Sequence, residues 1–584
     1  MRTMIKYLFT LLICICFISN PFAQTNLLIT NPEVDNILKG NYDPLSYLQT
    51  LTIDNPAAIS LGLLDNVTAD SLQSYLNSLV SFVNRNSGSD TLSDSIGIGA
   101  ARRWAYNKFQ TFSLANENRL RTSYFQFDQN ICAVNQHKNV LAVLPGLDTS
   151  NHQIILVEAH LDSRCEISCD ASCIANGADD NGSGSVLVLE LARVLSNYTF
   201  KNTIVFMLTT GEEQGLWGSK AFSQYAFINN IPIKVVQNND IVGGTICGER
   251  SSPPSCPGVS EIDSNNIRIF SQGINFSKNK QYARYIKMQY YDMLEPLMKV
   301  PMSINIMDGE DRTGRGGDHI PFRQKGYTAV RFTSSHEHGD GHPEIMGYTD
   351  HQHTVKDVIG LDTDFDNKID SFFIDFRYLR RNAIINGNAI AMAAQAVNTP
   401  TFDLNNSFGG MYITILSELQ YLSYKIMVRT NTNDFVGIYG LDGSINRFVP
   451  NTLTDSIYYI SVAAMDKNGI ESIFSQEQMA IAIADGPINT NVDVLNTNSQ
   501  LVFENISFKN GYLYLFVHSN NSSQEKLEFH LTDLLGRTIM KSEKTIMPYE
   551  NNIVLNLPSI REGFYFMSMI RENVVIGTKK IFIY

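Results

Sequence analysis

The chain has 584 residues, a hydrophobic fraction of 43% and a formal net charge of −13. This length exceeds what one compact domain normally holds, so we expect three or four domains. The negative charge argues against nucleic acid as a partner, because phosphate binding needs a cationic surface.

The first 23 residues have the pattern of a secretion signal. Arg2 and Lys6 give a short positive start, residues 7–18 are apolar, and Ala23 is a small residue suited to cleavage. The apolar run is too short to span a bilayer comfortably, and no later run is long enough. We therefore expect export, with no membrane anchor in the mature chain.

Six cysteines remain after the signal, and three of them are close together in the sequence. An even number of cysteines in an exported chain favours disulfide bonds. The close group could instead bind a metal ion as thiolates, but an oxidising destination makes bridges the better prediction. Their connectivity does not follow from the sequence. The six residues are Cys132, Cys165, Cys169, Cys173, Cys247 and Cys256.

Residues 24–114 are predicted to be mainly helical, with one helix over about 99–112. From 115 to 397, β-branched runs alternate with helical stretches. This alternation predicts an α/β fold, with a mostly parallel mixed sheet flanked by helices on both faces. A long helix over about 369–396 closes this part. The other expected strands are 154–159, 202–208, 233–238, 267–270, 304–307 and 327–332, and the other helices are 185–196 and 216–227.

Helical spacing disappears near residue 399, and two all-β blocks follow. Residues 402–485 form short alternating runs between turns, which predicts a β-sandwich. Residues 495–584 are predicted to form a second β-sandwich. The segment 489–499 is a plausible linker between them.

Five short motifs occur in order, and most of them stand where a predicted strand ends. Sites in open α/β sheets gather at the carboxyl ends of strands, so these side chains could meet in one crevice. The motifs are E-A-H-L-D at 158–162, G-A-D-D-N-G-S-G at 177–184, T-G-E-E-Q-G at 210–215, N-N-D at 238–240 and H-Q-H-T at 351–354.

Imidazoles and carboxylates together are donors that suit zinc. A carboxylate can bridge two zinc ions, a water shared by both ions loses its proton more readily, and a free carboxylate can accept that proton. Glu212 and Glu213 could divide the base and ligand roles, because neighbours leaving a strand point in different directions. Each motif alone also fits a helix cap or a solvated loop, and only the ordered set favours a metal site.

Residues 115–397 resemble the di-zinc exopeptidases that include secreted, double-zinc leucyl aminopeptidases of bacteria. The resemblance rests on A-H-L-D-S, G-A-D-D-N-G-S-G, G-E-E-Q-G-L-W-G-S, the aspartate of N-N-D and the final H-T. It implies two zinc ions in each chain. The implied ligands are His160 and Asp240 for one ion, Glu213 and His353 for the other, and Asp180 as the bridge.

The same resemblance assigns roles to residues around the ions. Glu212 would be the general base that takes a proton from the metal-bridging water and passes it to the leaving amine. Asp162 would orient His160 by accepting its second N–H. The implied activity is hydrolysis of peptide bonds in peptide substrates, with removal of N-terminal amino acids as the expected reaction.

Three further segments bear on the substrate. Many family members have tyrosine directly before the last histidine ligand, where this chain has Gln352, whose amide N–H could assist instead. The run G-G-D-H-I-P-F at 316–322 resembles a stretch near the substrate pocket, so Asp318 or His319 could contact substrate. The histidine-rich run at 335–342 is expected to be a loop lining the pocket rather than an extra metal site.

Both β blocks resemble known modules. Residues 402–485 are similar to a fibronectin type III module, mainly over Y-Y-I-S-V-A-A-M-D-K-N-G-I-E-S. Residues 495–584 resemble the sorting domain of type IX secretion in Bacteroidetes, through L-T-D-L-L-G-R, L-P-S-I-R-E-G-F-Y-F and the closing K-K-I-F-I-Y. This implies the secretion machinery as a partner, passage across both membranes, and a secreted or cell-surface location. A plain adhesive domain is the alternative.

Two other functions compete with the aminopeptidase. Glutaminyl cyclase-like transferases share the expected fold and use one zinc, and a non-catalytic binding protein could keep the fold without turnover. The presence of Asp240 and Glu213 favours two metals and hydrolysis. The presence of Glu212 together with every ligand weighs against the binding protein.

Overall fold

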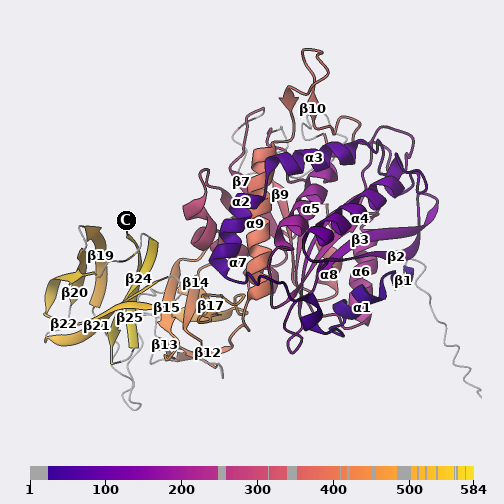
Figure 1. Ribbon diagram of the computed structural model, residues 1–584. Helices are drawn as coiled ribbons and strands as arrows, with labels where there is room; N and C mark the ends of the chain where they lie inside the picture. The colour runs from indigo at the N-terminus through magenta and orange to yellow at the C-terminus, as the bar shows by residue number, and fades with distance from the viewer. Residues whose placement is uncertain are drawn as a thin grey trace, which may run out of the picture.

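A computed structural model gives the fold, with a larger α/β unit at the right of Figure 1 and two smaller β units at the left. The structure describes residues 24–247, 258, 260–312, 315–337, 351–407, 410–416, 421–445, 447–448, 456–482, 501–509, 512–519, 523–533, 537–557, 560, 563–572 and 574–583. The signal sequence, the predicted linker and most of the histidine-rich run lie outside these residues.

A nine-stranded mixed sheet runs through the α/β unit, in the order β1-β2-β3-β5-β4-β6-β9-β7-β8. The central strands β5, β4, β6 and β9 are parallel, and antiparallel pairs lie on both sides of them. This confirms the predicted fold class. The strands are β1 (Thr25–Ile29), β2 (Arg121–Ile131), β3 (Val134–Leu144), β4 (Ile154–His160), β5 (Thr203–Thr209), β6 (Ile233–Asn239), β7 (Asn266–Ser271), β8 (Ser303–Ile306) and β9 (Ala329–Ser334).

Helices cover both faces of this sheet (Figure 1). One face packs against α2, α3, α4, α5, α7 and α9, and the other against α1, α6 and α8. The helices are α1 (Pro32–Leu38), α2 (Pro56–Asn66), α3 (Ala69–Val80), α4 (Gly97–Ala115), α5 (Gly184–Leu195), α6 (Trp217–Ile228), α7 (Lys278–Gln289), α8 (His319–Gln324) and α9 (Phe376–Gln395), with short turns η1 (Pro44–Tyr47), η2 (Ala178–Ser183), η3 (Tyr290–Leu294) and η4 (Glu295–Leu297).

Residues 24–114 pack as part of the α/β unit. Their helices α2, α3 and α4 share the main core with the sheet, and β1 pairs with β2 at the sheet edge. The mainly helical prediction for this region did not include β1, a short strand with mostly exposed side chains that gives no clear alternation.

The predicted long helix over 369–396 is wrong at its start. α9 begins at Phe376 because the Asp375 side chain accepts hydrogen bonds from the backbone N–H groups of Arg377 and Tyr378, which caps the helix there. The preceding residues instead form a short hairpin, with β10 (Gly360–Leu361) paired to β11 (Ser371–Phe372).

Disulfide bonds join two pairs of cysteines, Cys132 with Cys169 and Cys165 with Cys173. The alternative of a thiolate metal site for the close group is therefore wrong. Cys247 is also disulfide-bonded, and Cys256 lies outside the described residues. Both described bridges restrain the loop that follows β4.

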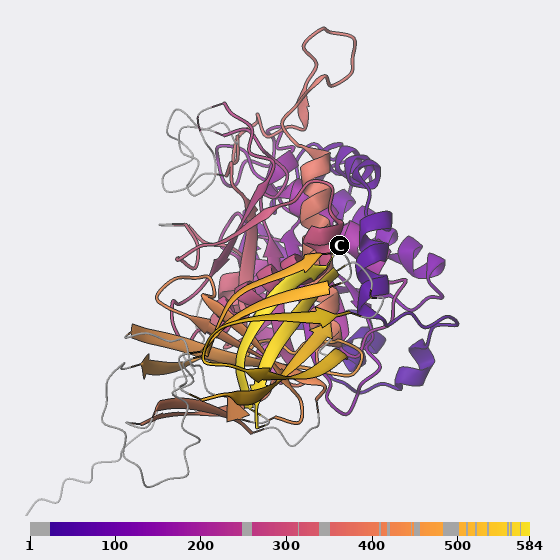
Figure 2. The same cartoon turned by 90° about the vertical axis from the view of Figure 1, so that its left-hand side faces the viewer.

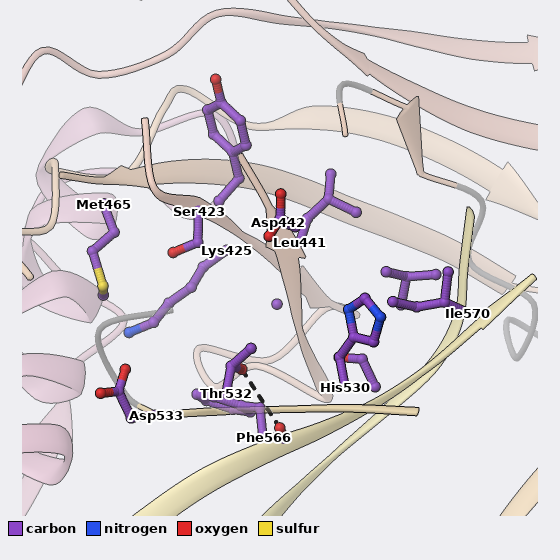
Figure 3. A pocket seen from close by; sticks show the side chains of 14 residues that line it. Ser423, Lys425, Leu441, Asp442, Met465, His530, Thr532, Asp533, Phe566 and Ile570 are labelled. Atoms are coloured by element: carbon purple, nitrogen blue, oxygen red, sulfur yellow. Dashed lines mark hydrogen bonds between the residues drawn. The ribbon is translucent and has the colours of Figure 1, made fainter. Parts of the chain in front are cut away.

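Each β unit contains a three-stranded and a four-stranded sheet. Ile570 and Val575 of the last unit pack into the core of the preceding one, beside a small cavity that Lys425 and His530 help to line (Figures 2 and 3). The strands are β12 (Phe402–Ser407), β13 (Gly410–Ile415), β14 (Ser423–Arg429), β15 (Gly437–Asp442), β16 (Arg447–Phe448), β17 (Ser456–Met465) and β18 (Gln478–Ala482), then β19 (Leu501–Lys509), β20 (Tyr512–Ser519), β21 (Glu525–Asp533), β22 (Thr538–Ile546), β23 (Tyr549–Asn556), β24 (Gly563–Arg571) and β25 (Val574–Ile583).

Buried ionic contacts join the first β unit to α7 and η3. Glu477 accepts hydrogen bonds from Arg284 at 3.0 Å and from Arg429 at 2.7 Å. Lys425 lies 2.9 Å from Asp292 and 3.1 Å from Glu471. These charges are buried and paired across the junction, so removing one partner would leave a buried charge uncompensated.

Within the described residues, no helix combines the length and the apolar character that a bilayer crossing requires.

Candidate metal centre

Asp180 lies between the two predicted histidine ligands. Its Oδ1 is 3.2 Å from His160 Nε2, and its Oδ2 is 3.1 Å from His353 Nε2. His160 ends β4, Asp180 lies in η2 before α5, and His353 precedes β10. One carboxylate thus presents a separate oxygen to each of two imidazoles, which is the arrangement that a bridge between two metal ions needs.

Two further carboxylates complete two donor sets. Asp240 directly follows β6, and its Oδ1 lies 3.5 Å from His160 Nε2. Glu213 follows β5, and its Oε2 lies 3.0 Å from His353 Nε2. The five predicted ligands come from separate segments of the chain, and the structure brings all of them together near the carboxyl ends of the central strands.

Glu212 stands beside the first donor set. Its Oε2 lies 4.0 Å from His160 Nε2, and its side chain is 13% exposed. Burial raises the pKa of Glu212 well above its ordinary value; nearby His160 opposes this, and the carboxylates of Asp240 and Asp318 add to it. A buried carboxyl group whose pKa is raised is suited to exchanging protons with a reacting group near neutral pH.

The backbone of Asp162, rather than its side chain, orients His160. His160 Nδ1 lies 3.0 Å from the Asp162 carbonyl oxygen and 3.8 Å from the nearest carboxylate oxygen. The carboxylate instead accepts hydrogen bonds from the backbone N–H groups of Glu212 and Glu213, each at 3.3 Å. The predicted role of Asp162 therefore changes: its side chain holds the loop that carries the base and a ligand.

Asp357 supports the bridging carboxylate, although no motif indicated it. Its two oxygens accept hydrogen bonds from the backbone N–H groups of Asp179 at 2.8 Å and Asp180 at 2.9 Å. Burial and the neighbouring Asp179 raise the pKa of Asp357 well above its ordinary value. Asp357 follows His353 closely in the sequence, so one loop supplies both a ligand and this support.

Arg85 is a second support that no motif indicated. Its fully buried guanidinium donates to the backbone carbonyls of Leu161 at 2.8 Å and Gly177 at 3.0 Å, and also to that of Asn176. These carbonyls belong to the segments that carry His160 and Asp180. Nothing near Arg85 in the sequence distinguishes it from a surface arginine, because its partners are distant in the chain.

Asp318 and His319 are both fully buried. Asp318 accepts hydrogen bonds from the hydroxyls of Thr209 at 2.5 Å and Ser219 at 2.6 Å. His319 Nε2 lies 2.9 Å from the backbone carbonyl of Glu310. Both side chains are thus engaged with protein groups, and substrate contact by either residue stays a prediction.

Gln352 is also buried, at 2% exposure. Its Oε1 accepts a hydrogen bond from Arg315 Nη2 at 2.5 Å. The ring of the neighbouring His351 packs edge-on against Phe373 at 5.0 Å, whereas His353 faces Asp180. A part for Gln352 in substrate binding stays a prediction.

The donor set fits zinc. Glu213 Oε1 and His353 Nδ1 are buried without a hydrogen-bond partner among the described residues, and Asp180 and Asp240 are each 4% exposed. Burial lowers the pKa of His353, but Glu213 and Asp180 outweigh it and raise that pKa to about 9. So many buried carboxylates around two imidazoles attract cations, and mixed nitrogen and oxygen donors match zinc.

Known proteins are similar in sequence to the part of the chain that carries this site. Residues 139–371 match a family model described as Peptidase family M28. A probable zinc metalloprotease of Pyrenophora tritici-repentis is 30% identical over 295 residues, which cover 47% of this chain and 65% of that protein. Another, from Phaeosphaeria nodorum, is 29% identical over 308 residues, covering 47% and 60%. The match thus spans less than two thirds of each of these curated relatives.

Among solved structures, the LapA aminopeptidase of Legionella pneumophila is 22% identical with a TM-score of 0.41, over 60% of this chain and 79% of that one. The family match includes the two histidines, the three carboxylate ligands and the general base predicted from the motifs. Residues 139–371 therefore form a domain of peptidase family M28.

Proposed function

We propose that this protein is an exported aminopeptidase that uses two zinc ions to hydrolyse the first peptide bond of its substrates. The observation that carries the proposal is the position of Asp180, whose two oxygens face two separate donor sets. The preference for the N-terminal bond is implied by the motifs, which resemble those of double-zinc leucyl aminopeptidases.

Each residue of the site has a part in this reaction. Bound zinc would polarise the substrate carbonyl and lower the pKa of a water molecule. Glu212 would take a proton from the attacking water and deliver it to the leaving amine. The Asp162 carboxylate holds the backbone N–H groups of both Glu212 and Glu213, so the base keeps a fixed position beside the donor sets.

The test combines zinc analysis with a substrate panel. The purified protein should contain about two zinc ions in each chain, and it should cleave aminoacyl amides but not N-blocked peptides. Glu212→Gln should keep the zinc and lose activity by about 10²–10⁴-fold, because it removes proton transfer while keeping the side-chain shape. The control is Glu117→Gln, an exposed glutamate bonded to Thr50, which should keep full activity.

Three results would contradict this proposal. Full activity of Glu212→Gln would remove that residue from its role. One zinc with cyclisation of N-terminal glutamine would favour the glutaminyl cyclase-like transferase. Two zinc ions without turnover of any peptide would favour the non-catalytic binding protein.

We also propose that residues 402–485 act as a fibronectin type III-like spacer and that residues 495–584 act as a type IX sorting domain. Two β units at the end of the chain support this proposal, as do disulfide bonds, which suit an oxidising destination. In a host with that pathway, the full chain should reach the outside of the cell, and a chain ending at residue 494 should stay between the membranes. Equal export of both would contradict the sorting role.

A further inference from the structure

Arg331, on β9, contacts Asp240, one of the proposed zinc ligands. It is fully buried, and its Nη2 lies 3.0 Å from Asp240 Oδ2. The other oxygen of the same carboxylate, Oδ1, faces His160 at 3.5 Å. The two oxygens of Asp240 are therefore divided, one toward the guanidinium and one toward the metal position.

Other charges fix Arg331 in place. Its Nη1 lies 2.8 Å from Asp311 Oδ1, and its Nη2 lies 2.8 Å from Glu337 Oε1. Arg268 and Arg312 also pair with Glu337, so three arginines and the three carboxylates of Asp240, Asp311 and Glu337 form one buried group. In this group the charge of Asp240 is already balanced before any metal binds.

The chain leaves room for this contact at Gly317. A Cβ atom placed on Gly317 would lie 3.2 Å from Arg331 Cδ and 3.1 Å from Asn238 Nδ2, tighter than ordinary packing. Gly317 precedes Asp318 in the G-G-D-H-I-P-F run. The absence of a side chain there leaves space for the stem of Arg331, whose guanidinium contacts Asp240.

In the described part of the chain, no arginine pairs with Glu213, the carboxylate of the second donor set. Glu213 Oε2 faces His353 at 3.0 Å, and Glu213 Oε1 is buried without a hydrogen-bond partner among the described residues. Within the described residues, no guanidinium thus competes with a cation for either oxygen of Glu213. The two positions offer unequal charge, although their residue types are the same.

We infer that Arg331 is a positioning residue that limits Asp240 to one oxygen, so that the His160–Asp240 position binds zinc more weakly than the Glu213–His353 position and fills second. The inference rests on the proposed function, because it requires both positions to take zinc. A guanidinium that pairs with a carboxylate neutralises part of the negative charge that would otherwise attract the ion, and its own positive charge repels the ion. Partners of ligands typically change metal affinity by about 10–100-fold.

The test is a zinc titration of metal-free protein in competition with a chromophoric chelator. The full chain should show two binding steps that differ by at least about tenfold in Kd. Asp240→Asn should abolish the weaker step, and Glu213→Gln should abolish the tighter one. Arg331→Gln, which keeps a hydrogen-bond donor but removes the charge, should tighten the weaker step by about tenfold and leave the other unchanged.

The matched control is Arg268→Gln, which removes a charge from the same group without contacting Asp240. It should leave both steps within about threefold of their wild-type Kd, well below the effect expected for a ligand's partner. Equal steps in the wild-type protein, or loss of the weaker step in Glu213→Gln, would overturn the inference, and so would equal shifts in Arg331→Gln and Arg268→Gln. If Arg331→Gln does not fold, the two ligand variants still decide the order of filling. Absence of zinc binding altogether would instead refute the proposed function.

Discussion

Replacing Arg85 by methionine should destabilise the metal-free protein by about 2 kcal/mol or more. The substitution leaves the buried carbonyl of Leu161 and the part-buried carbonyl of Asn176 without their donor, whereas the Gly177 carbonyl still accepts from the backbone N–H of Gly182. Each unsatisfied acceptor costs about 1–3 kcal/mol, which gives about 2–6 kcal/mol for the two. Relief from burying a charge offsets part of this loss, so the low end of the range is expected.

The assay is equilibrium urea unfolding at pH 7 with a chelator present. Arg103→Met is the matched control, because Arg103 also donates to three backbone carbonyls, but its side chain is 38% exposed. Water can replace the lost donor there, so the control should lose less than about 1 kcal/mol. Equal losses in the two variants would refute the argument that burial makes the Arg85 contacts costly to remove.

Two further predictions concern pH and the disulfides. Burial lowers the pKa of His137 to about 4, so the unfolded chain takes up a proton near pH 6.5 while the folded chain does not. Stability should therefore fall by about 3 kcal/mol between pH 6.5 and pH 4. His137→Gln should reduce the pH dependence of urea unfolding by that amount, and an unchanged pH dependence would contradict the assignment. Cys132→Ser opens a bridge of sequence separation 37 and should lower the free energy of unfolding by about 3–4 kcal/mol. A loss below about 1 kcal/mol would show that this bridge does little to restrict the unfolded chain.

The central fold and the ligand set followed from local patterns. β4 and β5 are buried along their whole length, so their sequences are mostly apolar runs that alternate with amphipathic helices. His160 ends β4, Glu213 follows β5 and Asp240 directly follows β6, which is why the convergence of these ligands could be expected from the order of the motifs.

The supports of the site could not be predicted in the same way. Arg85 and Asp357 act through contacts with segments far away in the chain, and nothing beside them in the sequence marks those contacts. Arg331 did leave a signal, because a charged residue inside the buried run A-V-R-F-T-S must have a partner. The start of α9 was missed because the apolar spacing continues upstream of the Asp375 cap.

The buried junction at Glu477 would have a consequence if the proposed attachment to a cell surface takes place. Arg284 of α7 and Arg429 of β14 share this carboxylate, and the last β unit in turn packs onto the first (Figure 1). An attachment through the last β unit would therefore hold the α/β unit through packed contacts rather than through a flexible linker. The distance and orientation of the metal centre relative to the membrane would then be set by the contacts between the units.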